Sequence, residues 1–464
     1  MSLHWQVQQP PDRERGKPPS LWIAFAIFVV VQLVGTAITV MTWGAKPVAS
    51  VDFFVRLLVL PLSATAVLCA ALYKGYENRI SETDWWNYLC RSLQSRWRSW
   101  AQRYVVIVAC ATVTPEAAVA ERMLGLEGPK PDNAGERLPL DGQNQEFNES
   151  RLEGVLRRLL VPLSETVTAI APPHTLHVCL QSTAQEGLAE LRQVWEQLHL
   201  PEFATFSWQS LEASLSPAEP WLANGQRELA DFQLTLACQL HQPGEEPVWS
   251  EVAVALQTTT PTGLAAHKNK FKPLAYLFRP ITTESDQVVE AMHTLLRAQQ
   301  VLPDCIKQLW VSGLAGQSWH ITQSAVRDCG LELPARNLDE AIGKPGPVSS
   351  LLLHALAAQM VRHGQGVQLA VTSVPSGVQL GLVGTQLAPI ASVDPTYYPM
   401  FSLCTTIQLL GIACLVLFGV QTLGGIPDWL PSVVLAVVIL MIPLQIGASI
   451  LLRRETTNDF HAHL

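Results

Sequence analysis

Four apolar segments, two near each end of the chain, constrain its fold more than any other feature of the sequence. They cover residues 21–43, 53–73, 401–423 and 430–452. Each is long enough to cross a hydrocarbon core of about 30 Å as a helix, which takes about 20 predominantly apolar residues. The sequence therefore predicts two membrane-spanning helices near each end and a folded domain between the two pairs.

Polar side chains are rare inside these segments: Gln32 lies in the first, Arg56 near the start of the second and Gln445 in the fourth. Arg56 is close enough to the end of its segment for the guanidinium group to reach the lipid–water interface. The segments contain no carboxylate and no pair of opposite charges. Since ionisable residues inside a membrane usually mark a pathway for ions or substrates, the composition favours anchorage over transport.

The positions of lysine and arginine predict the orientation of the chain, because loops rich in these residues stay in the cytoplasm. Basic residues precede the first segment, follow the second and follow the fourth: Arg13, Arg15, Lys17, Lys74, Arg79, Arg91, Arg96, Arg98, Arg103, Arg453 and Arg454. The two short loops offer only Lys46 on one side and Asp428 on the other. Both termini and the central domain are therefore predicted to face the cytoplasm.

The segment 75–103 combines tryptophan with arginine. Its aromatic and basic residues are Trp85, Trp86, Arg91, Arg96, Trp97, Arg98, Trp100 and Arg103. In one interpretation they form an amphipathic helix at the membrane interface, where such rings and basic groups both find partners. In the other, the segment is a helical stalk whose tryptophans pack on the domain itself. The sequence leaves both interpretations open.

Between residues 104 and 395, the spacing of apolar residues predicts alternating strands and helices. The apolar run 104–111 is typical of a strand buried on both faces, and helical spacing follows at 152–163 and 188–198. An order of strand, helix, strand and helix, closed by an antiparallel pair, occurs twice. We therefore predict an α/β domain with internal pseudo-twofold symmetry, with residues 104–257 as its first half and 258–395 as its second.

The predicted domain organisation follows from these elements. It comprises a cytoplasmic tail at 1–20, a membrane hairpin at 21–74, an interfacial segment at 75–103, the two α/β halves, a second membrane hairpin at 400–452 and a cytoplasmic tail at 453–464.

Charge and motif content exclude several functions. The formal net charge of −8 argues against nucleic-acid binding, which needs a basic surface. The nine cysteines lack the spacing of a metal site. The sequence also has no phosphate-binding loop, dinucleotide fingerprint or nucleophile elbow. No metal and no cofactor is predicted.

The sequence Ile342-Gly343-Lys344-Pro345-Gly346-Pro347-Val348-Ser349, with a predicted helix behind it and a β-hairpin after that, resembles a loop of the thiolase and β-ketoacyl-synthase family. The duplicated α/β unit also resembles that fold. Enzymes of the family carry a Gly-His motif in this loop, where the histidine polarises a thioester carbonyl, and here Lys344 takes its place. Their nucleophile is a cysteine at the tip of a helix in the first half. Cys110 follows the first strand instead, so the resemblance implies a degenerate, non-catalytic site.

In length, domain order and composition, the chain is also similar to accessory and adaptor proteins of bacterial type VI secretion. That similarity implies an adaptor or scaffold in the bacterial inner membrane, whose cytoplasmic domain binds a secretion effector or a subunit of the secretion apparatus. A second hypothesis is a membrane-associated enzyme that binds or processes acyl thioesters, using Lys344 and an unidentified nucleophile.

Overall fold

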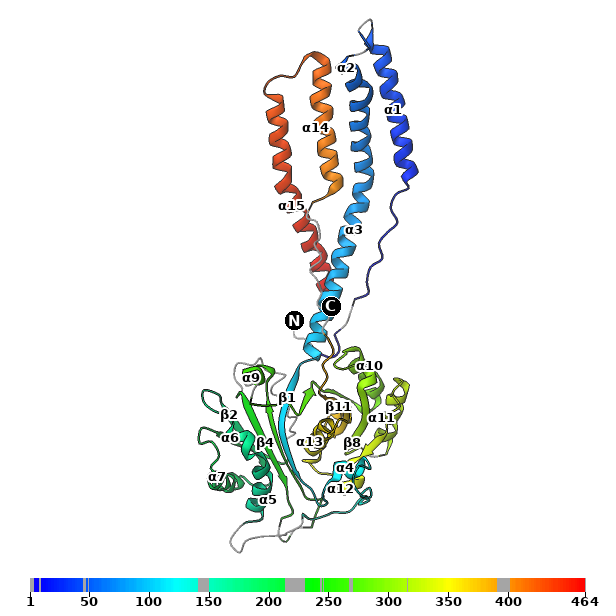
Figure 1. The fold of residues 1–464 in the computed structure, drawn as a ribbon. Coiled ribbons are helices and arrows are strands. Elements are labelled where there is room, and N and C mark those ends of the chain that lie inside the picture. Colours follow the sequence, from blue (N-terminus) through cyan, green and yellow to red (C-terminus); the bar gives the residue numbers. More distant parts are fainter. Residues whose placement is uncertain are drawn as a thin grey trace. The chain divides into compact units, whose positions relative to one another are not determined.

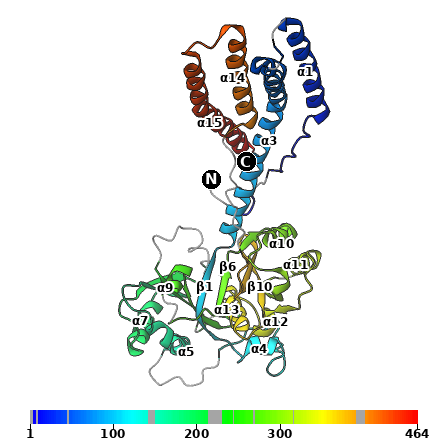
Figure 2. The ribbon, with the colours of Figure 1, turned by 45° about the horizontal axis from the view of Figure 1, so that its top comes forward.

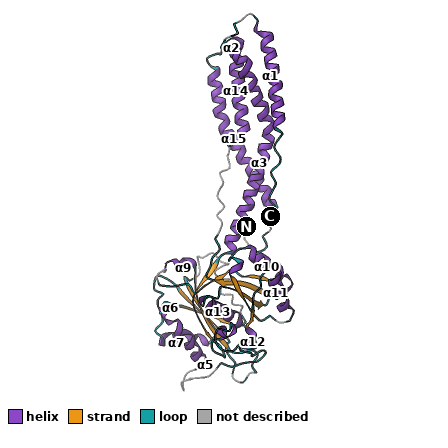
Figure 3. Cartoon of the chain, turned by 45° about the vertical axis from the view of Figure 1, so that its right-hand side comes forward, coloured by secondary structure: helices purple, strands orange, loops and turns teal. Residues whose placement is uncertain are grey.

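The computed structural model describes residues 4–7, 10–44, 47, 48, 50–140, 150–212, 230–242, 244, 246–266, 270–314, 316–389 and 401–463, so Lys46 lies outside the described residues. The chain divides into two compact units. One comprises Met1–Trp5 and Trp97–Ile390, and the other Gln6–Arg96 and Ala391–Leu464. The first holds the strands and the second is helical (Figures 1 and 3). We call them the α/β unit and the helical unit.

The helical unit contains the four predicted apolar helices. Its elements are α1 (Leu21–Trp43), α2 (Val51–Phe54), the π-helical turn η1 (Val55–Val59), α3 (Leu60–Ala101), whose last turn belongs to the α/β unit, α14 (Leu403–Gly424) and α15 (Leu430–Ala462). In the described part of the chain, four helices are long and apolar enough to cross a membrane. Serine side chains at positions 20, 50 and 402 cap the starts of α1, α2 and α14.

Two helices run beyond their apolar segments. α3 continues to Ala101, so the predicted interfacial segment 75–103 is mostly a continuation of the second spanning helix. α15 continues to Ala462, and most of the predicted tail 453–464 is therefore helical. The extension of α15 packs within the helical unit: Phe460 is 1% exposed and meets the Trp86 ring edge-on, with the ring centroids 5.3 Å apart.

Charged residues of the second spanning helix contact both ends of α14. Arg56 donates a hydrogen bond to the carbonyl oxygen of Thr422, near the C-terminus of α14. Glu77 accepts hydrogen bonds from the Ser402 hydroxyl at 2.6 Å and from the backbone N–H of Leu403 at 2.5 Å, at its N-terminus. A cation at the C-terminus and an anion at the N-terminus both complement the dipole of a helix. These two contacts therefore fix the position of α14 against α3.

Replacing Glu77 with alanine should destabilise the helical unit by about 1–2 kcal/mol, since it removes the acceptor for the first turn of α14. The readout is the thermal unfolding temperature of the detergent-solubilised full chain. Glu455→Ala is the matched control, because Glu455 is exposed on α15. Equal shifts in the two variants would contradict this role of Glu77.

The α/β unit is built on a mixed sheet, whose first half contains β1 (Tyr104–Val113), β2 (Leu176–Ser182), β3 (Thr205–Ser210), β4 (Phe232–Gln239) and β5 (Val252–Thr259). Its second half contains β6 (Ala275–Phe278), β7 (Ile281–Thr283), β8 (Ile306–Ser312), β9 (Ala335–Asn337), β10 (Val367–Val374) and β11 (Gly377–Gly384). The strand order is β3-β2-β4-β5-β1-β6-β11-β10-β8-β9, with β7 beside β11.

This order repeats itself about the central antiparallel pair of β1 and β6. In the first half, β2 is parallel to β3 and β4, whereas β5 is antiparallel to β4 and β1. In the second half, β8 is parallel to β9 and β10, whereas β11 is antiparallel to β10 and β6. The five main strands of each half therefore have the same order and the same relative directions.

Helices cover both halves of the sheet. They are α4 (Val119–Met123), α5 (Arg151–Leu160), η2 (Val161–Leu163), α6 (Ser164–Thr168), α7 (Gly187–Gln197), α9 (Pro261–Ala266), η3 (Ser285–Gln287), α10 (Val288–Arg297), η4 (Pro303–Cys305), α11 (Gln317–Asp328), α12 (Leu338–Ile342) and α13 (Ser349–Arg362). One buried cluster joins α5 and α7 to the first half of the sheet, and another joins α10 and α11 to the second.

A third cluster surrounds α13, which lies at the centre of the α/β unit (Figures 1 and 2). Leu352, Leu353 and Ala357 of this helix are all 0% exposed. α13 contacts strands of both halves, including β1, β5, β10 and β11. Because most of its residues, on all sides of the helix, are buried, α13 is a central core helix. Both halves of the sheet therefore bring their inner faces to one helix.

Candidate functional site

The loop singled out from the sequence, Gly343–Gly346, precedes α13. Sequence analysis identified the helix that follows it, but not the short helix α12 in front of it. α12 forms because the Asn337 side chain accepts a hydrogen bond from the backbone N–H of Asp339 at 3.1 Å, and it ends at Gly343 with φ +85°. The loop thus joins two helices at the N-terminus of the central one.

Residues of the first half of the α/β unit hold this loop on both sides. The N–H of Lys344 donates to the Glu136 carbonyl at 2.7 Å, and its carbonyl accepts from the N–H of Ser250 at 2.9 Å. Gln239, which is 0% exposed, accepts from the N–H of Val348 at 3.1 Å and donates to the Ser250 carbonyl at 2.6 Å. The backbone of the loop is therefore a structural link between the two halves.

The two glycines have no free space beside them. A Cβ at Gly343 would lie 2.5 Å from both the Glu136 carbonyl oxygen and the Ser250 hydroxyl, and one at Gly346 would collide with the Gln239 amide. Pro345 is half-buried between them. Protein atoms therefore pack closely against both glycines of the loop.

Lys344 itself is exposed. Both hydrogen bonds that hold it involve its backbone, and its ammonium group has no hydrogen bond or ion pair among the residues that the structure describes. Across that same part of the chain, no cluster of three or more His, Cys, Asp or Glu side chains is placed to bind a metal ion. The loop thus places the ammonium group of Lys344 at the surface, and no described residue contacts that group as a general acid, base or nucleophile would.

A buried carboxylate lies directly behind the loop. Glu251 is 0% exposed and follows Ser250, whose N–H holds Lys344. One of its oxygens accepts from the N–H of Leu140 at 2.6 Å and from the Arg151 guanidinium, and the other accepts from the N–H of His241 at 2.5 Å. This carboxylate is fully engaged in joining three segments, which is a structural task.

Candidate nucleophiles lie elsewhere in the α/β unit. The prediction that Cys110 follows the first strand was wrong, because Cys110 lies within β1 and pairs with Leu256 of β5. Its thiol contacts the Ala355 carbonyl at 3.6 Å, and burial raises its pKa to about 12, which keeps it protonated. Cys329 lies 3.6 Å from the Nδ1 atom of His293, and burial raises the pKa of this thiol as well. None of these groups contacts the Lys344 loop, and a raised thiol pKa is the opposite of nucleophile activation.

A hydroxyl–imidazole pair joins the two outermost strands of the first half. The Ser207 hydroxyl is 2.9 Å from Nε2 of His177, and the Thr205 hydroxyl is 3.1 Å from Nδ1. Burial lowers the pKa of His177. Both ring nitrogens are bound by hydroxyl groups, so no carboxylate orients the ring as in a catalytic triad. We interpret this pair as a cross-strand contact between β2 and β3.

The tryptophans predicted at the membrane interface are largely enclosed by protein. Trp97 is 0% exposed, donates from Nε1 to the His4 carbonyl at 3.2 Å and meets the Trp5 ring edge-on. Trp100 lies beneath the guanidinium of Arg279, 4.2 Å from its ring centroid. These contacts are all within the α/β unit. They fit the second of the two interpretations, a helical stalk packed on the domain.

The other aromatic and basic residues of segment 75–103 differ in how exposed their side chains are. In the helical unit, Trp86 is 2% exposed and donates to the Pro11 carbonyl at 3.0 Å, while Trp85 is half-buried and donates to the Thr457 hydroxyl at 3.0 Å. The basic residues Arg91, Arg96 and Arg103 are exposed, and Arg98 is half-buried. A contact of the exposed arginines with lipid headgroups stays a prediction.

Comparison with known proteins gives similarity in fold alone. No protein-family model and no curated protein matches the chain. A chain from a complex of a type II polyketide synthase acyl-carrier protein with its ketosynthase, bound to a hexaketide, is 12% identical, with a TM-score of 0.45 over 61% of this chain and 99% of that one. An oxazolomycin ketosynthase domain from Streptomyces albus is 11% identical, with a TM-score of 0.43 over 64% and 99% of the two chains. Human mitochondrial 3-ketoacyl-CoA thiolase in complex with CoA is 9% identical, with a TM-score of 0.39 over 61% and 98%. These values do not assign the chain to a family.

Sequence reasoning missed the groups that hold the loop. Gln239 and Glu251 lie at the ends of two apolar strands, and a polar residue that interrupts such a run is a signal of a buried hydrogen-bonding role. Their partners, Val348 and Leu140, lie 109 and 111 residues away in the chain. No local pattern predicts such pairings.

Proposed function

We propose that this chain is a membrane-anchored, non-catalytic adaptor or scaffold whose α/β unit is a degenerate thiolase-like domain. The observation that carries the proposal is the packing in front of α13. Gln239, Glu136 and Ser250 fill the space beside Gly343 and Gly346, and the exposed Lys344 has no hydrogen bond or ion pair from its ammonium group to any residue that the structure describes. An acyl-thioester enzyme needs an open crevice there with an activated nucleophile.

The thiolase-like assignment draws its support from the strand order. Both halves repeat one arrangement of five main strands about the β1–β6 pair, and the simplest origin of such a repeat is duplication of one unit. A degenerate enzyme domain keeps a stable scaffold, while its surface is available for binding a protein. By analogy with secretion accessory proteins, we place the chain in a bacterial inner membrane, with a secretion effector or apparatus subunit as its partner.

A thioester assay tests the non-catalytic part of the proposal. The full chain, reconstituted in lipid nanodiscs, is incubated with acetyl-, malonyl- and palmitoyl-CoA. We expect no release of free thiol above the background of empty nanodiscs, and no acyl adduct in intact-protein mass spectrometry. A stoichiometric adduct would overturn the proposal in favour of the acyl-transfer enzyme.

Lys344→Ala tests the role of the loop in binding. Because the loop is held by backbone hydrogen bonds, we expect the variant to fold normally and to capture its protein partners from solubilised membranes at wild-type levels. Partners are compared by quantitative mass spectrometry, with Lys307→Ala, which also replaces an exposed lysine of the α/β unit, as the control. Complete loss of function in Lys344→Ala alone, at normal protein levels, would revive the enzyme hypothesis.

Reporter fusions test the proposed orientation. Alkaline phosphatase is active only outside the cytoplasm, so a fusion at Asn133 should be inactive and a fusion at Val48, in the first short loop, should be active. The reason is the concentration of basic residues after the second apolar segment. The reverse pattern would place the α/β unit outside the cytoplasm.

A further inference from the structure

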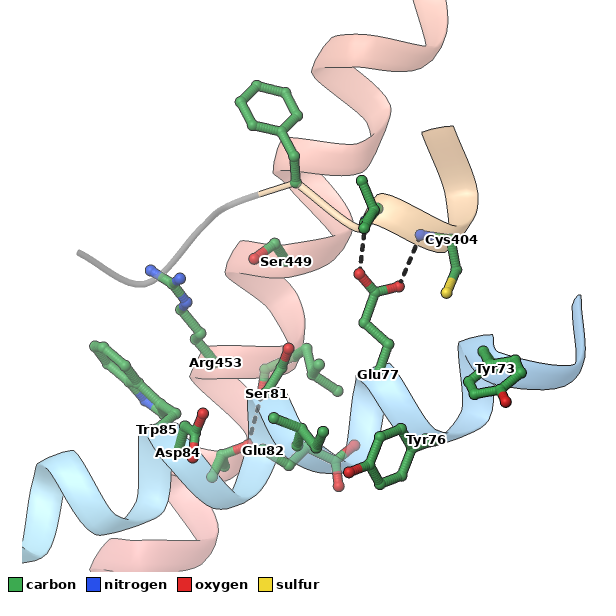
Figure 4. Close-up of a pocket in the computed structure, with 15 residues that line it drawn as sticks. Tyr73, Tyr76, Glu77, Ser81, Glu82, Asp84, Trp85, Cys404, Ser449 and Arg453 are labelled. Carbon is green, nitrogen blue, oxygen red and sulfur yellow. Dashed lines mark hydrogen bonds between the residues drawn. The ribbon is translucent and has the colours of Figure 1, made fainter. Parts of the chain in front are cut away.

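A cavity of about 320 Å³ lies among α3, α14 and α15 in the helical unit (Figure 4). The side chains around it are mainly aromatic and aliphatic, with a few charged groups, and include Tyr73, Tyr76, Glu82, Trp85, Leu452 and Arg453. Its volume is within the range of roughly 300–1,000 Å³ that is typical of small-molecule sites. A mixed lining of this kind fits a ligand that has both an apolar and a polar part.

The cavity lies where the apolar segments end. On α3, Tyr73 lines it and the next residue is Lys74; on α15, Leu452 and Arg453 both line it, at the change from apolar to basic sequence. α14 begins beside it at Leu403. Aromatic and basic residues at such a boundary lie at the level of lipid headgroups when the helices span a bilayer. If the helices span a bilayer, the polar groups at the level of this cavity are therefore lipid headgroups.

The charges around the cavity distinguish between headgroups. Glu77 is occupied by the N-terminus of α14, and Asp84 forms an ion pair with Arg15 at 2.7 Å. Glu82 is a further carboxylate in the lining, and the guanidinium of Arg453 lies 5.0 Å from the ring centroid of Trp85. Among the described residues Glu82 forms no ion pair, so the lining presents this carboxylate together with the guanidinium of Arg453, which fits a zwitterionic headgroup that contains an amine.

We propose that this cavity binds the headgroup of phosphatidylethanolamine, a proposal that rests on the membrane anchorage in the proposed function. Arg453 donates hydrogen bonds to the phosphate, and Glu82 accepts from the primary ammonium group. Tyr76 also lines the cavity, and the face of its ring would provide further favourable electrostatics for the ammonium. Choline, which has no N–H group, cannot donate to Glu82, and the headgroup of phosphatidylglycerol has no ammonium group to place beside this carboxylate.

The test uses the full chain in nanodiscs made from equal amounts of phosphatidylethanolamine, phosphatidylglycerol and phosphatidylcholine. After extraction into mild detergent, native mass spectrometry identifies the lipids that remain bound. We expect several-fold enrichment of phosphatidylethanolamine, which Glu82→Gln and Arg453→Gln each abolish. The matched controls are Arg454→Gln and Glu455→Gln, which change exposed neighbours on α15 that do not line the cavity, and they should retain the enrichment.

Several outcomes would overturn the proposal: no enrichment in the wild type, preference for phosphatidylglycerol, or retention of the preference in Glu82→Gln. Glycerophosphoethanolamine, which has the headgroup without acyl chains, should displace the lipid only at much higher concentration. Displacement at equal concentration would assign the cavity to a soluble phosphoamine instead. A negative result in the lipid-binding experiment would not change the thioester or partner-capture results. The lipid-binding proposal can therefore be rejected without rejecting the proposed function.

Discussion

Replacing Glu251 with glutamine should destabilise the α/β unit by about 1–3 kcal/mol, the cost of leaving a buried hydrogen-bonding group unsatisfied. Both carboxylate oxygens accept hydrogen bonds from backbone N–H groups, those of Leu140 and His241. Glutamine has one carbonyl oxygen, so its NH₂ group would face an N–H donor and leave it unsatisfied. The Arg151 guanidinium would also lose its anionic partner.

The measurement is thermal unfolding of the detergent-solubilised full chain, followed by near-ultraviolet circular dichroism. Glu246→Gln is the control, because Glu246 also pairs with an arginine, Arg137, but its side chain is 87% exposed. Exposed pairs contribute about 0–1 kcal/mol, so the control should unfold close to the wild type. If both variants lost the same small amount of stability, Glu251 would not hold the segments of Leu140, Arg151 and His241 together.

The sequence predicted those parts of the fold that depend on local periodicity. The apolar segments became α1, α3, α14 and α15, and the alternating order of elements became the two halves of the sheet. The helical spacing at 188–198 predicted α7, since its apolar face repeats within the helix itself. Elements of this kind are specified by neighbours within one or two turns, so a local pattern is enough to predict them.

Prediction failed where the structure depends on distant partners. The short helix α12 has only five residues, too few for periodicity to reveal it. The glycines and prolines around Lys344 predicted a loop at this position, but they did not predict which residues contact that loop. Gln239 contributes from the end of β4 and Glu136 from a segment that precedes α5. These distant residues come together because both halves of the sheet pack around α13. No local sequence pattern encodes that packing.

Gly343→Ala tests whether that packing is as tight as the proposed function requires. Gly343 has φ +85° and ψ −154°, a backbone conformation that is essentially restricted to glycine and in which a side chain costs about 1–3 kcal/mol. Its new methyl group would also lie 2.5 Å from the Glu136 carbonyl oxygen and the Ser250 hydroxyl. Relieving that contact requires movement of a segment that also holds Lys344, which adds about 1–3 kcal/mol as in other overpacked sites. We therefore expect a total loss of about 2–6 kcal/mol in the free energy of unfolding, measured by thermal unfolding.

Gly330→Ala is the control for a glycine that has positive φ but open surroundings. Gly330 has φ +77°, and no atom lies within 4 Å of the position of its Cβ. This variant should lose only the backbone cost of about 1–2 kcal/mol, less than Gly343→Ala, which adds the close contacts with the first half. Equal losses would mean that the loop has space beside it. An open crevice at the N-terminus of α13 would remove the main argument against a bound acyl thioester.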